Sequence, residues 1–265
     1  MNEKHLRLKE QIAELGSVAV AFSSGIDSAL LLAVAHEALG DRAVAFTATS
    51  PADPPGEAGD AAAFCAEREI KHVTFAVNQL EEIDGFERNP KDRCYICKRH
   101  LFTKLKELAR AESLAHVVEG SNVDDLGEHR PGNRALAELG IASPLLDCGF
   151  TKQDVRTLSR ELGLPTWDKP SLACLYTRFP YGALVTPEAL RRVDEAERFL
   201  LKRGFRTVRV RSIGDTARIE VAPADVGRLS DPPLLEETTG LFRTLGFASV
   251  EVDPRGYRTG SMDED

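Results

Sequence analysis

A short run of small polar residues near the start of the chain has the composition of a phosphate site: Ser23, Ser24, Gly25, Asp27 and Ser28. A glycine lets the backbone come close to a phosphate, and serine hydroxyls donate hydrogen bonds to its oxygens. A carboxylate such as that of Asp27 is a ligand that Mg²⁺ uses beside phosphate oxygens. The run therefore favours binding of a nucleotide's phosphates, and a tight turn with a serine helix cap is the alternative.

The residues on either side predict a strand before this run and a helix after it. Residues 18–22 are a continuous apolar stretch with β-branched and aromatic members, typical of a strand buried on both faces. Residues 29–39 favour a helix, and Gly40 is the kind of residue that ends one. In such a unit the free N–H groups and the positive dipole end of the helix point at an anion held by the loop.

Two cysteines, Cys94 and Cys97, form the second candidate group. We expect a helix at about residues 94–113, which places both thiols within one turn, where they can hold a metal ion or a cluster. Basic neighbours favour the thiolate forms, namely Arg93, Lys98 and Arg99. Two half-buried helical cysteines without a ligand are the alternative.

A third candidate ligand is Cys174, in a loop-like stretch at residues 164–182 that contains several prolines. Three thiolates suit a [4Fe–4S] cluster with one open iron, and zinc with an outside fourth ligand is the other option. The remaining cysteines, Cys65 and Cys148, have apolar neighbours and are expected in the core.

The pattern along the first two thirds of the chain predicts an α/β fold. Further apolar runs predict strands at residues 43–49, 72–77 and 116–120, with helices between them at about 58–69 and 94–113. Strands that alternate with helices form a doubly wound, mostly parallel sheet. Ligands bind at the carboxyl ends of the strands of such a sheet, so the loops after Phe22, Thr49 and Glu119 should face one site.

The loop after the strand at residues 116–120 adds candidate magnesium ligands. Gly120 is followed by small donors and by the paired carboxylates of Asp124 and Asp125. Mg²⁺ usually takes one or two carboxylates together with phosphate oxygens. The alternative for this stretch is an ordinary Asx turn that caps a helix.

From about residue 183 the pattern changes to that of a small α+β domain. Its expected elements are a charged helix at 187–203, strands at 207–211 and 217–221 joined by a Gly214-Asp215 hairpin, a helix at about 233–245 and a strand at 248–252. We therefore predict a nucleotide-binding domain at residues 1–182 and a substrate-binding or oligomerisation domain at residues 183–265.

Two arginines of this second part are candidates for binding an anion. Arg209 and Arg211 are two residues apart and point to the same side of one strand, where they form a fork for a group such as a phosphate. Apolar and basic residues alternate there, as in a half-exposed strand. A solvated strand face paired with Glu220 is the alternative.

Composition limits the classes of partner. The chain has 265 residues and a formal net charge of −8, which argues against a dominant nucleic-acid surface. No apolar run approaches the ~20 residues that a membrane span needs, and residues 1–14 form a charged amphipathic pattern rather than a signal peptide. We expect a cytoplasmic protein with no membrane partner and no nucleic-acid partner. The five cysteines then favour metal-binding or catalytic roles over disulfides.

The run from Ser23 to Ser28 resembles the Ser-Gly-Gly-x-Asp-Ser loop of the ATP pyrophosphatase (PP-loop) superfamily, whose members adenylate a substrate and release pyrophosphate. Ser24 stands where that pattern has its first glycine, and a positive φ at this serine would be strained. The resemblance implies ATP and Mg²⁺, with a catalytic role for Asp27. The expected nucleotide contacts are Ala21, Ser23, Ser24, Gly25, Asp27, Ser28, Thr49, Gly120 and Asp125.

Later motifs resemble the LarE family of ATP-dependent sulfur insertases, over nearly the whole chain. They are Lys169-Pro170-Ser171, Ala173-Cys174-Leu175, Arg178-Phe179-Pro180-Tyr181-Gly182, Val208-Arg209-Val210-Arg211 and Gly256-Tyr257-Arg258-Thr259-Gly260-Ser261-Met262. The resemblance implies adenylation of pyridinium-3,5-biscarboxylic acid mononucleotide. Its carboxylates would then become thiocarboxylates, in the synthesis of the nickel-pincer nucleotide cofactor.

The same resemblance implies roles for single residues. Substrate binding is expected of Arg178, Tyr181, Arg209 and Arg211, and catalysis of Cys174. Some members give up the sulfur of one cysteine and keep dehydroalanine, whereas others with three cysteines are thought to use a sulfide carried by a cluster. Cys94, Cys97 and Cys174 place this chain with the second group, so sulfide or another sulfur donor is an expected partner. We also expect a homo-oligomer.

Two other functions remain open on the sequence. A PP-loop tRNA thiolase also uses three cysteines and a cluster, but it needs a basic RNA surface that the acidic net charge disfavours. A nucleotide-binding sensor without turnover, with Cys94 and Cys97 holding a structural zinc, belongs to a different class.

Overall fold

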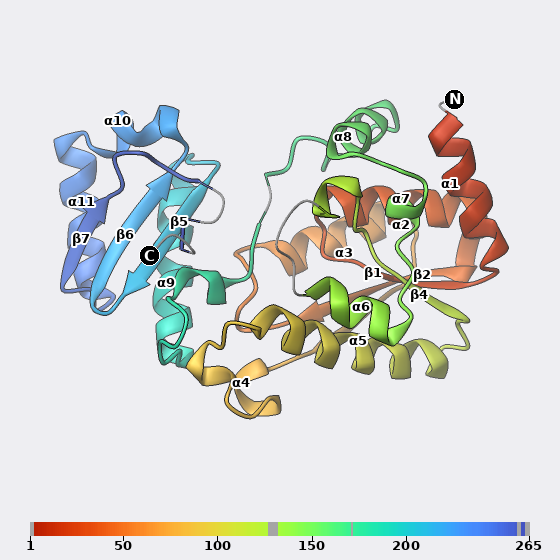
Figure 1. Ribbon diagram of the computed structural model, residues 1–265. Helices are drawn as coiled ribbons and strands as arrows, with labels where there is room; N and C mark the ends of the chain where they lie inside the picture. The colour runs from red at the N-terminus through yellow and green to blue at the C-terminus, as the bar shows by residue number, and fades with distance from the viewer. Residues whose placement is uncertain (1–2, 127–131, 171, 259–260, 263–265) are drawn as a thin grey trace. The chain divides into compact units, whose positions relative to one another are not determined.

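The computed structural model describes residues 3–126, 132–170, 172–258 and 261–262 (Figure 1). By contacts the chain forms two compact units. The first comprises Met1–Ser50, Gly56–Gln79 and Asp92–Ser171, and the second comprises Pro51–Pro55, Leu80–Lys91 and Leu172–Asp265. The two domains predicted at residues 1–182 and 183–265 stay a prediction. Ser171, Thr259 and Gly260 of the family motifs lie outside the described residues.

The first unit contains a four-stranded parallel sheet, which confirms the predicted α/β class. Its strands are β1 (Val18–Ala21), β2 (Ala43–Thr49), β3 (His72–Ala76) and β4 (His116–Val118). They are ordered β3-β2-β1-β4, and every pairing is parallel. The strand order therefore reverses between β1 and β4, and the carboxyl ends of strands at such a switch point are where open α/β sheets bind ligands.

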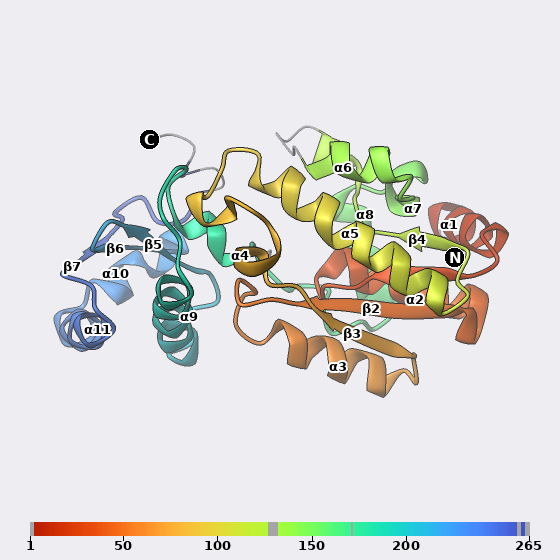
Figure 2. The same cartoon turned by 90° about the horizontal axis from the view of Figure 1, so that it is seen from below.

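Helices cover both faces of this sheet, with α3 and α5 on opposite sides of it in Figure 2. One face packs against α1 (Glu3–Glu14), α2 (Ile26–Leu39), α3 (Glu57–Glu67), α7 (Pro144–Asp147) and α8 (Lys152–Glu161). The other face packs against α5 (Arg93–Ala111) and α6 (Gly132–Leu139). The short helix α4 (Gln79–Glu82) follows β3.

Strand β1 shows why its sequence has no polar residue. Val18 and Val20 lie in the cluster that contains α2, whereas Ala19 lies in the cluster that contains α5. All three side chains are inaccessible to solvent. The continuous apolar run thus reflects a strand buried on both faces, as the sequence predicts.

The second unit contains a three-stranded mixed sheet. Its strands β5 (Val208–Ile213), β6 (Thr216–Val221) and β7 (Ser249–Val252) are ordered β5-β6-β7. Gly214 and Asp215 form the predicted hairpin between β5 and β6, with Ile213 opposite Thr216. The helices are α9 (Pro187–Lys202), α10 (Val226–Leu229) and α11 (Pro232–Thr244). Short 3-10 helices occur at Gly40–Arg42, Phe86–Arg88, Val123–Leu126, Leu175–Arg178 and Pro223–Asp225.

The prediction of a half-exposed strand at β5 is wrong. Arg209 is 3% exposed and Arg211 is 4% exposed, so the basic side of the strand is buried as well as the apolar side. The cause is the chain after β7, because Arg209 lies 4.9 Å from the ring centroid of Tyr257 and Arg211 bonds to Ser261. Alternation alone does not reveal this tertiary cover.

Two segments from the first third of the chain belong to the second unit through specific hydrogen bonds. Leu175 donates its N–H to the carbonyl of Ala52, at 2.8 Å. Asn89 is fully buried, and its amide donates to the carbonyls of Phe179 and Pro180, each at 2.9 Å. These bonds explain why the segments group with the chain after residue 172.

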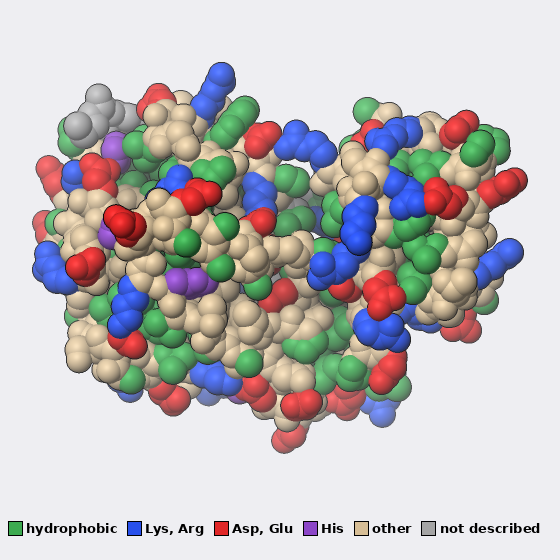
Figure 3. Space-filling model, turned by 180° about the vertical axis from the view of Figure 1, so that it is seen from behind, with side chains coloured by type: hydrophobic (Ala, Val, Ile, Leu, Met, Phe, Trp, Pro, Cys, Tyr) green, Lys and Arg blue, Asp and Glu red, His purple; other side chains and the backbone are tan. Residues whose placement is uncertain are grey.

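The surface carries charges of both signs. On the face in Figure 3, acidic and basic side chains are mixed over the elements that it displays. Among the described helices, none combines the length and the hydropathy required to span a membrane.

Candidate active site

The loop between β1 and α2 is held together by its own serines. Ser28 accepts a hydrogen bond from the N–H of Ser23 at 3.3 Å, and its hydroxyl donates to the carbonyl of Gly25 at 3.2 Å. The Ser23 and Ser28 hydroxyls are 3.2 Å apart. Gly25 is the N-cap of α2 and has no side chain to occupy the N–H groups of the first turn. The strand, loop and helix predicted for an anion site are therefore present.

Ser24 adopts the left-handed backbone conformation, with φ of 54°. This is the strain expected of a serine in a position where the PP-loop pattern has glycine, and it costs an L-residue about 1–2 kcal/mol. Ser24 is 1% exposed, and its hydroxyl donates to the carbonyl of Glu57 at 3.3 Å. Lys169 donates to the Ser24 carbonyl at 3.1 Å and to its hydroxyl at 3.0 Å.

The loop after β4 meets the start of α2 at the switch point. A Cβ added to Gly120 would lie 3.0 Å from the Ser28 nitrogen and 3.1 Å from the carbonyl carbon of Asp27. The side-chain amide of Asn122 donates to one carboxylate oxygen of Asp27 at 3.0 Å. Asp125 accepts from the N–H of Asn122 at 3.0 Å. The expected convergence of the loops after β1 and β4 is thus present.

Lys152, the first residue of α8, forms an ion pair with the second oxygen of Asp27. Its own N–H donates to Asp124 at 2.6 Å, which ties the start of α8 to the loop after β4. Sequence reasoning identified Thr151 as the helix cap but missed Lys152. The available signal was that a residue directly after a cap lies in the first turn of its helix.

A capping box holds the start of α8 in place. Thr151 accepts a hydrogen bond from the N–H of Asp154, and Asp154 accepts one from the N–H of Thr151. Lys4 donates to the Asp154 carboxylate at 2.6 Å. This bond, together with those from Thr151, lowers the pKa of Asp154 to about 2.

Ala21 and Thr49 lie at the carboxyl ends of β1 and β2, as expected. The Thr47 hydroxyl donates to the carbonyl of Phe22 at 2.8 Å, and His72 bonds to the same hydroxyl at 2.8 Å. Burial lowers the pKa of His72. These bonds fix the end of β1, whereas contact of Ala21 and Thr49 with a nucleotide stays a prediction.

Cys94 and Cys97 lie in the first turns of α5, which confirms that the Cys-x-x-Cys opens a helix. Cys94 is exposed and Cys97 is partly buried. The Gln79 amide donates to the Cys97 sulfur at 3.7 Å, and Gln79 accepts from Ser50, which follows β2, at 2.6 Å. In the described parts of the chain, no three His, Cys, Asp or Glu side chains form a metal-binding group.

Cys65 and Cys148 are core residues, as the sequence predicts. Both are buried in the cluster between the sheet and α2. Burial raises the pKa of the Cys65 thiol to about 11, and burial also raises the pKa of Cys148. Both thiols are therefore weak nucleophiles at neutral pH.

In the second unit, Cys174 is exposed just before the 3-10 helix Leu175–Arg178. Arg178 is completely buried and binds Glu197 through two hydrogen bonds, of 2.7 and 3.0 Å. Its third nitrogen donates to the carbonyls of Ala173 and Cys174. Arg178 thus fixes the peptide that carries Cys174, and sequence reasoning missed Glu197. A substrate contact of Arg178, or of the exposed Tyr181, stays a prediction.

Arg211 has several partners within the second unit. Its guanidinium donates to Glu220 at 2.7 and 3.0 Å, to the carbonyl of Thr177 at 2.9 Å and to the hydroxyl of Ser261 at 3.0 Å. Burial and then the charge of Arg178 lower the pKa of Arg209. Glu220 is the partner that the sequence offered as an alternative, but it lies in a buried cluster rather than on a solvated face.

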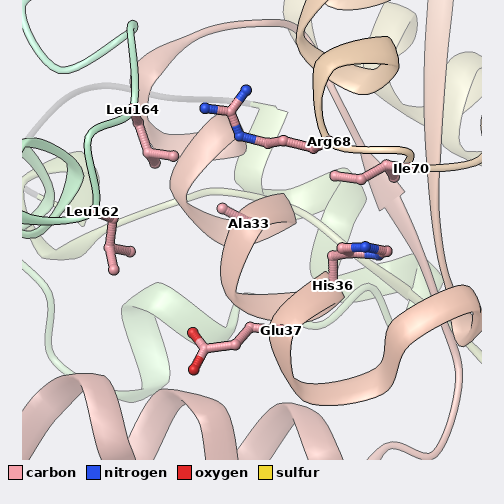
Figure 4. Close-up of a pocket in the computed structure, with 7 residues that line it drawn as sticks. All are labelled: Ala33, His36, Glu37, Arg68, Ile70, Leu162 and Leu164. Carbon is pink, nitrogen blue, oxygen red and sulfur yellow. The ribbon is translucent and has the colours of Figure 1, made fainter.

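A separate cavity of about 290 Å³ lies beside the second half of α2, away from the loop at the start of that helix (Figure 4). It is lined by Ala33, His36, Glu37, Arg68, Ile70, Leu162 and Leu164. Its charged residues have ion-pair partners, since Lys9 pairs with Glu37 and Glu67 pairs with Arg68. It shares no residue with the expected nucleotide site.

Comparison with known proteins gave matches over nearly the full chain, although no family model matches it. An uncharacterized protein of Synechocystis sp. is 40% identical over 262 residues, which cover 99% of this chain and 97% of that protein. The pyridinium-3,5-bisthiocarboxylic acid mononucleotide synthase of Lactiplantibacillus plantarum is 34% identical over 262 residues, covering 98% and 94%. A subunit of the glutamine-hydrolysing GMP synthase of Pyrococcus furiosus is 26% identical over 225 residues, covering 74% and 66%.

Proposed function

The chain belongs to the LarE family of the PP-loop superfamily, and from that premise we propose that it is an ATP-dependent sulfurtransferase. Its substrate is pyridinium-3,5-biscarboxylic acid mononucleotide, and its product is the corresponding thiocarboxylate of nickel-pincer cofactor synthesis. The observation that carries the proposal is the meeting of the Ser23–Ser28 loop with Gly120 and Asn122 at the switch point of the sheet.

The first step of the proposed reaction activates a carboxylate, which is a poor electrophile. A substrate carboxylate oxygen attacks the α-phosphorus of ATP, the bond between the α- and β-phosphates breaks, and pyrophosphate leaves. Backbone N–H groups at the start of α2 and the hydroxyls of Ser23 and Ser28 stabilise the charge on the pyrophosphate. Lys152 is the cation nearest to Asp27 and is suited to bind the same phosphates.

Asp27 and Asp125 are the proposed magnesium ligands, and their carboxylates are of the kind that Mg²⁺ takes beside phosphate oxygens. Both lie next to Asn122, which bonds to each of them. The ion needs an oxygen of Asp27 that now accepts from Lys152. Binding of Mg²⁺ and release of the Lys152 ammonium toward a phosphate are therefore expected together.

A sulfur nucleophile then attacks the carboxyl carbon of the adenylate, and AMP leaves with the electron pair of the broken C–O bond. We propose Cys94, Cys97 and Cys174 as ligands of a [4Fe–4S] cluster, supported by two thiols within one helical turn and by the exposure of Cys94 and Cys174. When bound, such a cluster supplies a nucleophilic sulfide. Arg178 contributes by holding the peptide of Cys174 in one conformation.

Arg209 and Arg211 are proposed to bind the phosphate of the mononucleotide. They lie on one side of β5, and guanidinium groups bind phosphate oxygens through charge-assisted bonds. Arg211 already donates to Glu220, so the phosphate competes with Ser261 and with the Thr177 carbonyl for its remaining N–H groups.

The test is pyrophosphate release from MgATP, measured with and without the mononucleotide substrate on anaerobically purified protein. We expect release that depends on the substrate and disappears in Asp27→Ala. Undiminished release by this variant would refute the assignment of the site. Release that depends on tRNA instead would point to a thiolase, and zinc without turnover would point to a sensor.

The source of the sulfur needs its own measurement on the same sample. Iron and acid-labile sulfide are quantified before turnover, and the mass of the Cys174 peptide is compared before and after. A cluster enzyme keeps the mass of Cys174 over many turnovers. A loss of roughly 34 Da per product, one H₂S, would instead show that Cys174 is consumed.

A further inference from the structure

The side chain of Lys169 reaches a residue 145 positions earlier in the chain, Ser24. Its ammonium group donates to the Ser24 carbonyl at 3.1 Å, to the Ser24 hydroxyl at 3.0 Å and to the Asp60 carboxylate at 2.7 Å. A lysine ammonium has three donors, so these bonds account for all of them. The side chain of Lys169 is 16% exposed, whereas that of Asp60 is 60% exposed.

Ser24 is the residue of the loop that needs such support. Its φ of 54° is natural for glycine but strained for a residue with a Cβ. Because Ser24 is buried, water does not satisfy its carbonyl and hydroxyl, and Lys169 and the Glu57 carbonyl do so instead. The partners that make the left-handed conformation favourable are thus donated from α3 and from the residues before Pro170.

We propose that Lys169 is a positioning residue of the phosphate loop, which holds Ser24 in the left-handed conformation and thereby orients the N–H groups on both sides of it. A left-handed residue among right-handed ones turns successive N–H groups toward one side, where they form a concavity for an anion. Asp60 keeps the ammonium group on Ser24. The nucleotide readout rests on the proposed function, but the link between the two residues does not.

The test is a double-mutant cycle on the full-length protein, with the Kd of MgATP measured by calorimetry. Lys169→Met keeps the length of the stem and removes the charge, and we expect a Kd roughly tenfold higher. Ser24→Gly adopts the same φ without help, so its Kd should stay within about twofold of the wild type. The double variant should lie within about threefold of Ser24→Gly, which is the non-additivity of two coupled residues.

Two further variants control this cycle. Asp60→Asn removes the surface partner that keeps Lys169 in place, and we expect a smaller rise in Kd that Ser24→Gly also suppresses. If Lys169→Met does not fold, the pair of Asp60→Asn and Ser24→Gly completes the cycle. Lys71→Met makes the same chemical change at a lysine that pairs with Glu112 on the surface, and it should leave the Kd unchanged.

The outcomes separate this inference from the proposed function. An equal loss of affinity from Lys169→Met with serine or glycine at position 24 means that Lys169 contacts the phosphates itself, and the positioning role is then wrong. If the wild type binds no MgATP, the proposed function fails, and the same four proteins are compared by urea unfolding. Non-additive free energies of unfolding would then support the link between Lys169 and Ser24, and additive ones would overturn it.

Discussion

The Lys152 ammonium is paired with the Asp27 carboxylate across 125 residues of the chain. Asn122 bonds to the other carboxylate oxygen at 3.0 Å, so both oxygens of Asp27 have a donor. Thus α8 and the loop after β4 together set the orientation of Asp27. A cation therefore already lies where the proposed magnesium ion would bind, and the two compete for one carboxylate.

This competition predicts opposite effects of one substitution. In Lys152→Met, Asp27 loses its cation, so Mg²⁺ alone should bind more tightly. The affinity for ATP should fall roughly tenfold, because a cation suited to the phosphates is gone. Calorimetric titration with Mg²⁺ and with MgATP checks both effects. Parallel changes in the two affinities would contradict the competition, and Lys106→Met, whose lysine bonds to the Leu139 carbonyl, is the control.

A second prediction concerns Gly120. In Gly120→Ala, the new Cβ would lie 3.0 Å from the Ser28 nitrogen, and because this atom is backbone, α2 must shift. We expect a loss of about 1–3 kcal/mol in the free energy of unfolding and weaker MgATP binding. Gly59→Ala is the matched control, since Gly59 lies in α3 with nothing within 4 Å of an added Cβ. Equal behaviour of the two variants would refute the close approach.

A third prediction is that the capping box of α8 contributes stability only above acidic pH. The folded pKa of Asp154 is about 2, below its ordinary value of 3.8. A depressed carboxyl pKa stabilises the fold above the unfolded pKa, and this contribution is lost as the pH falls from about 4 to about 2. Asp154→Asn should therefore cost up to about 2 kcal/mol at pH 7 and much less near pH 2.

Urea unfolding of Asp154→Asn and of the wild type across that pH range is the measurement. Asp41→Asn, at an exposed residue of a 3-10 helix, serves as the control and should change the free energy of unfolding little at any pH. A difference between Asp154→Asn and the wild type that persists unchanged to pH 2 would show that the carboxylate charge is not the cause.

A fourth prediction orders the cysteines by reactivity. Iodoacetamide applied to the native protein at pH 8 should modify the exposed Cys94 and Cys174 and spare the buried Cys65 and Cys148. Burial and the raised pKa of the two core thiols both slow their alkylation. Peptide mass spectrometry checks this, and denatured protein, in which all five cysteines react, is the control. Rapid modification of Cys65 would mean that the core cluster opens readily.

Local signals in the sequence were sufficient for the main elements. Apolar runs predicted the parallel strands, the small residues after Phe22 predicted the loop, and Gly214-Asp215 predicted the hairpin of the second unit. Each of these features depends on a few consecutive residues, whose backbone preferences and side-chain period are encoded where they stand. The positive φ of Ser24 was foreseeable for the same reason, from a serine in a glycine position.

The pairs that assemble the site were not predictable in this way. Lys152 with Asp27, Lys169 with Ser24 and Arg178 with Glu197 each join distant parts of the sequence. Their meeting depends on strand order and on the path of the connecting loops, which periodicity does not encode. The burial of Arg211 has the same origin, because its cover comes from Ser261, 50 residues later.

The composition of the second unit has a consequence for how the chain is made. Asn89 leaves the ribosome about 90 residues before Phe179 and Pro180, whose carbonyls it binds. At 5–20 residues per second, its amide waits roughly 5–20 seconds for these partners. Pro51–Pro55 and Leu80–Lys91 must therefore stay unassembled while the parallel sheet forms around them. Protease cleavage between residues 171 and 172 would leave the later fragment without these early segments, so the two halves of the gene do not encode two separate folds.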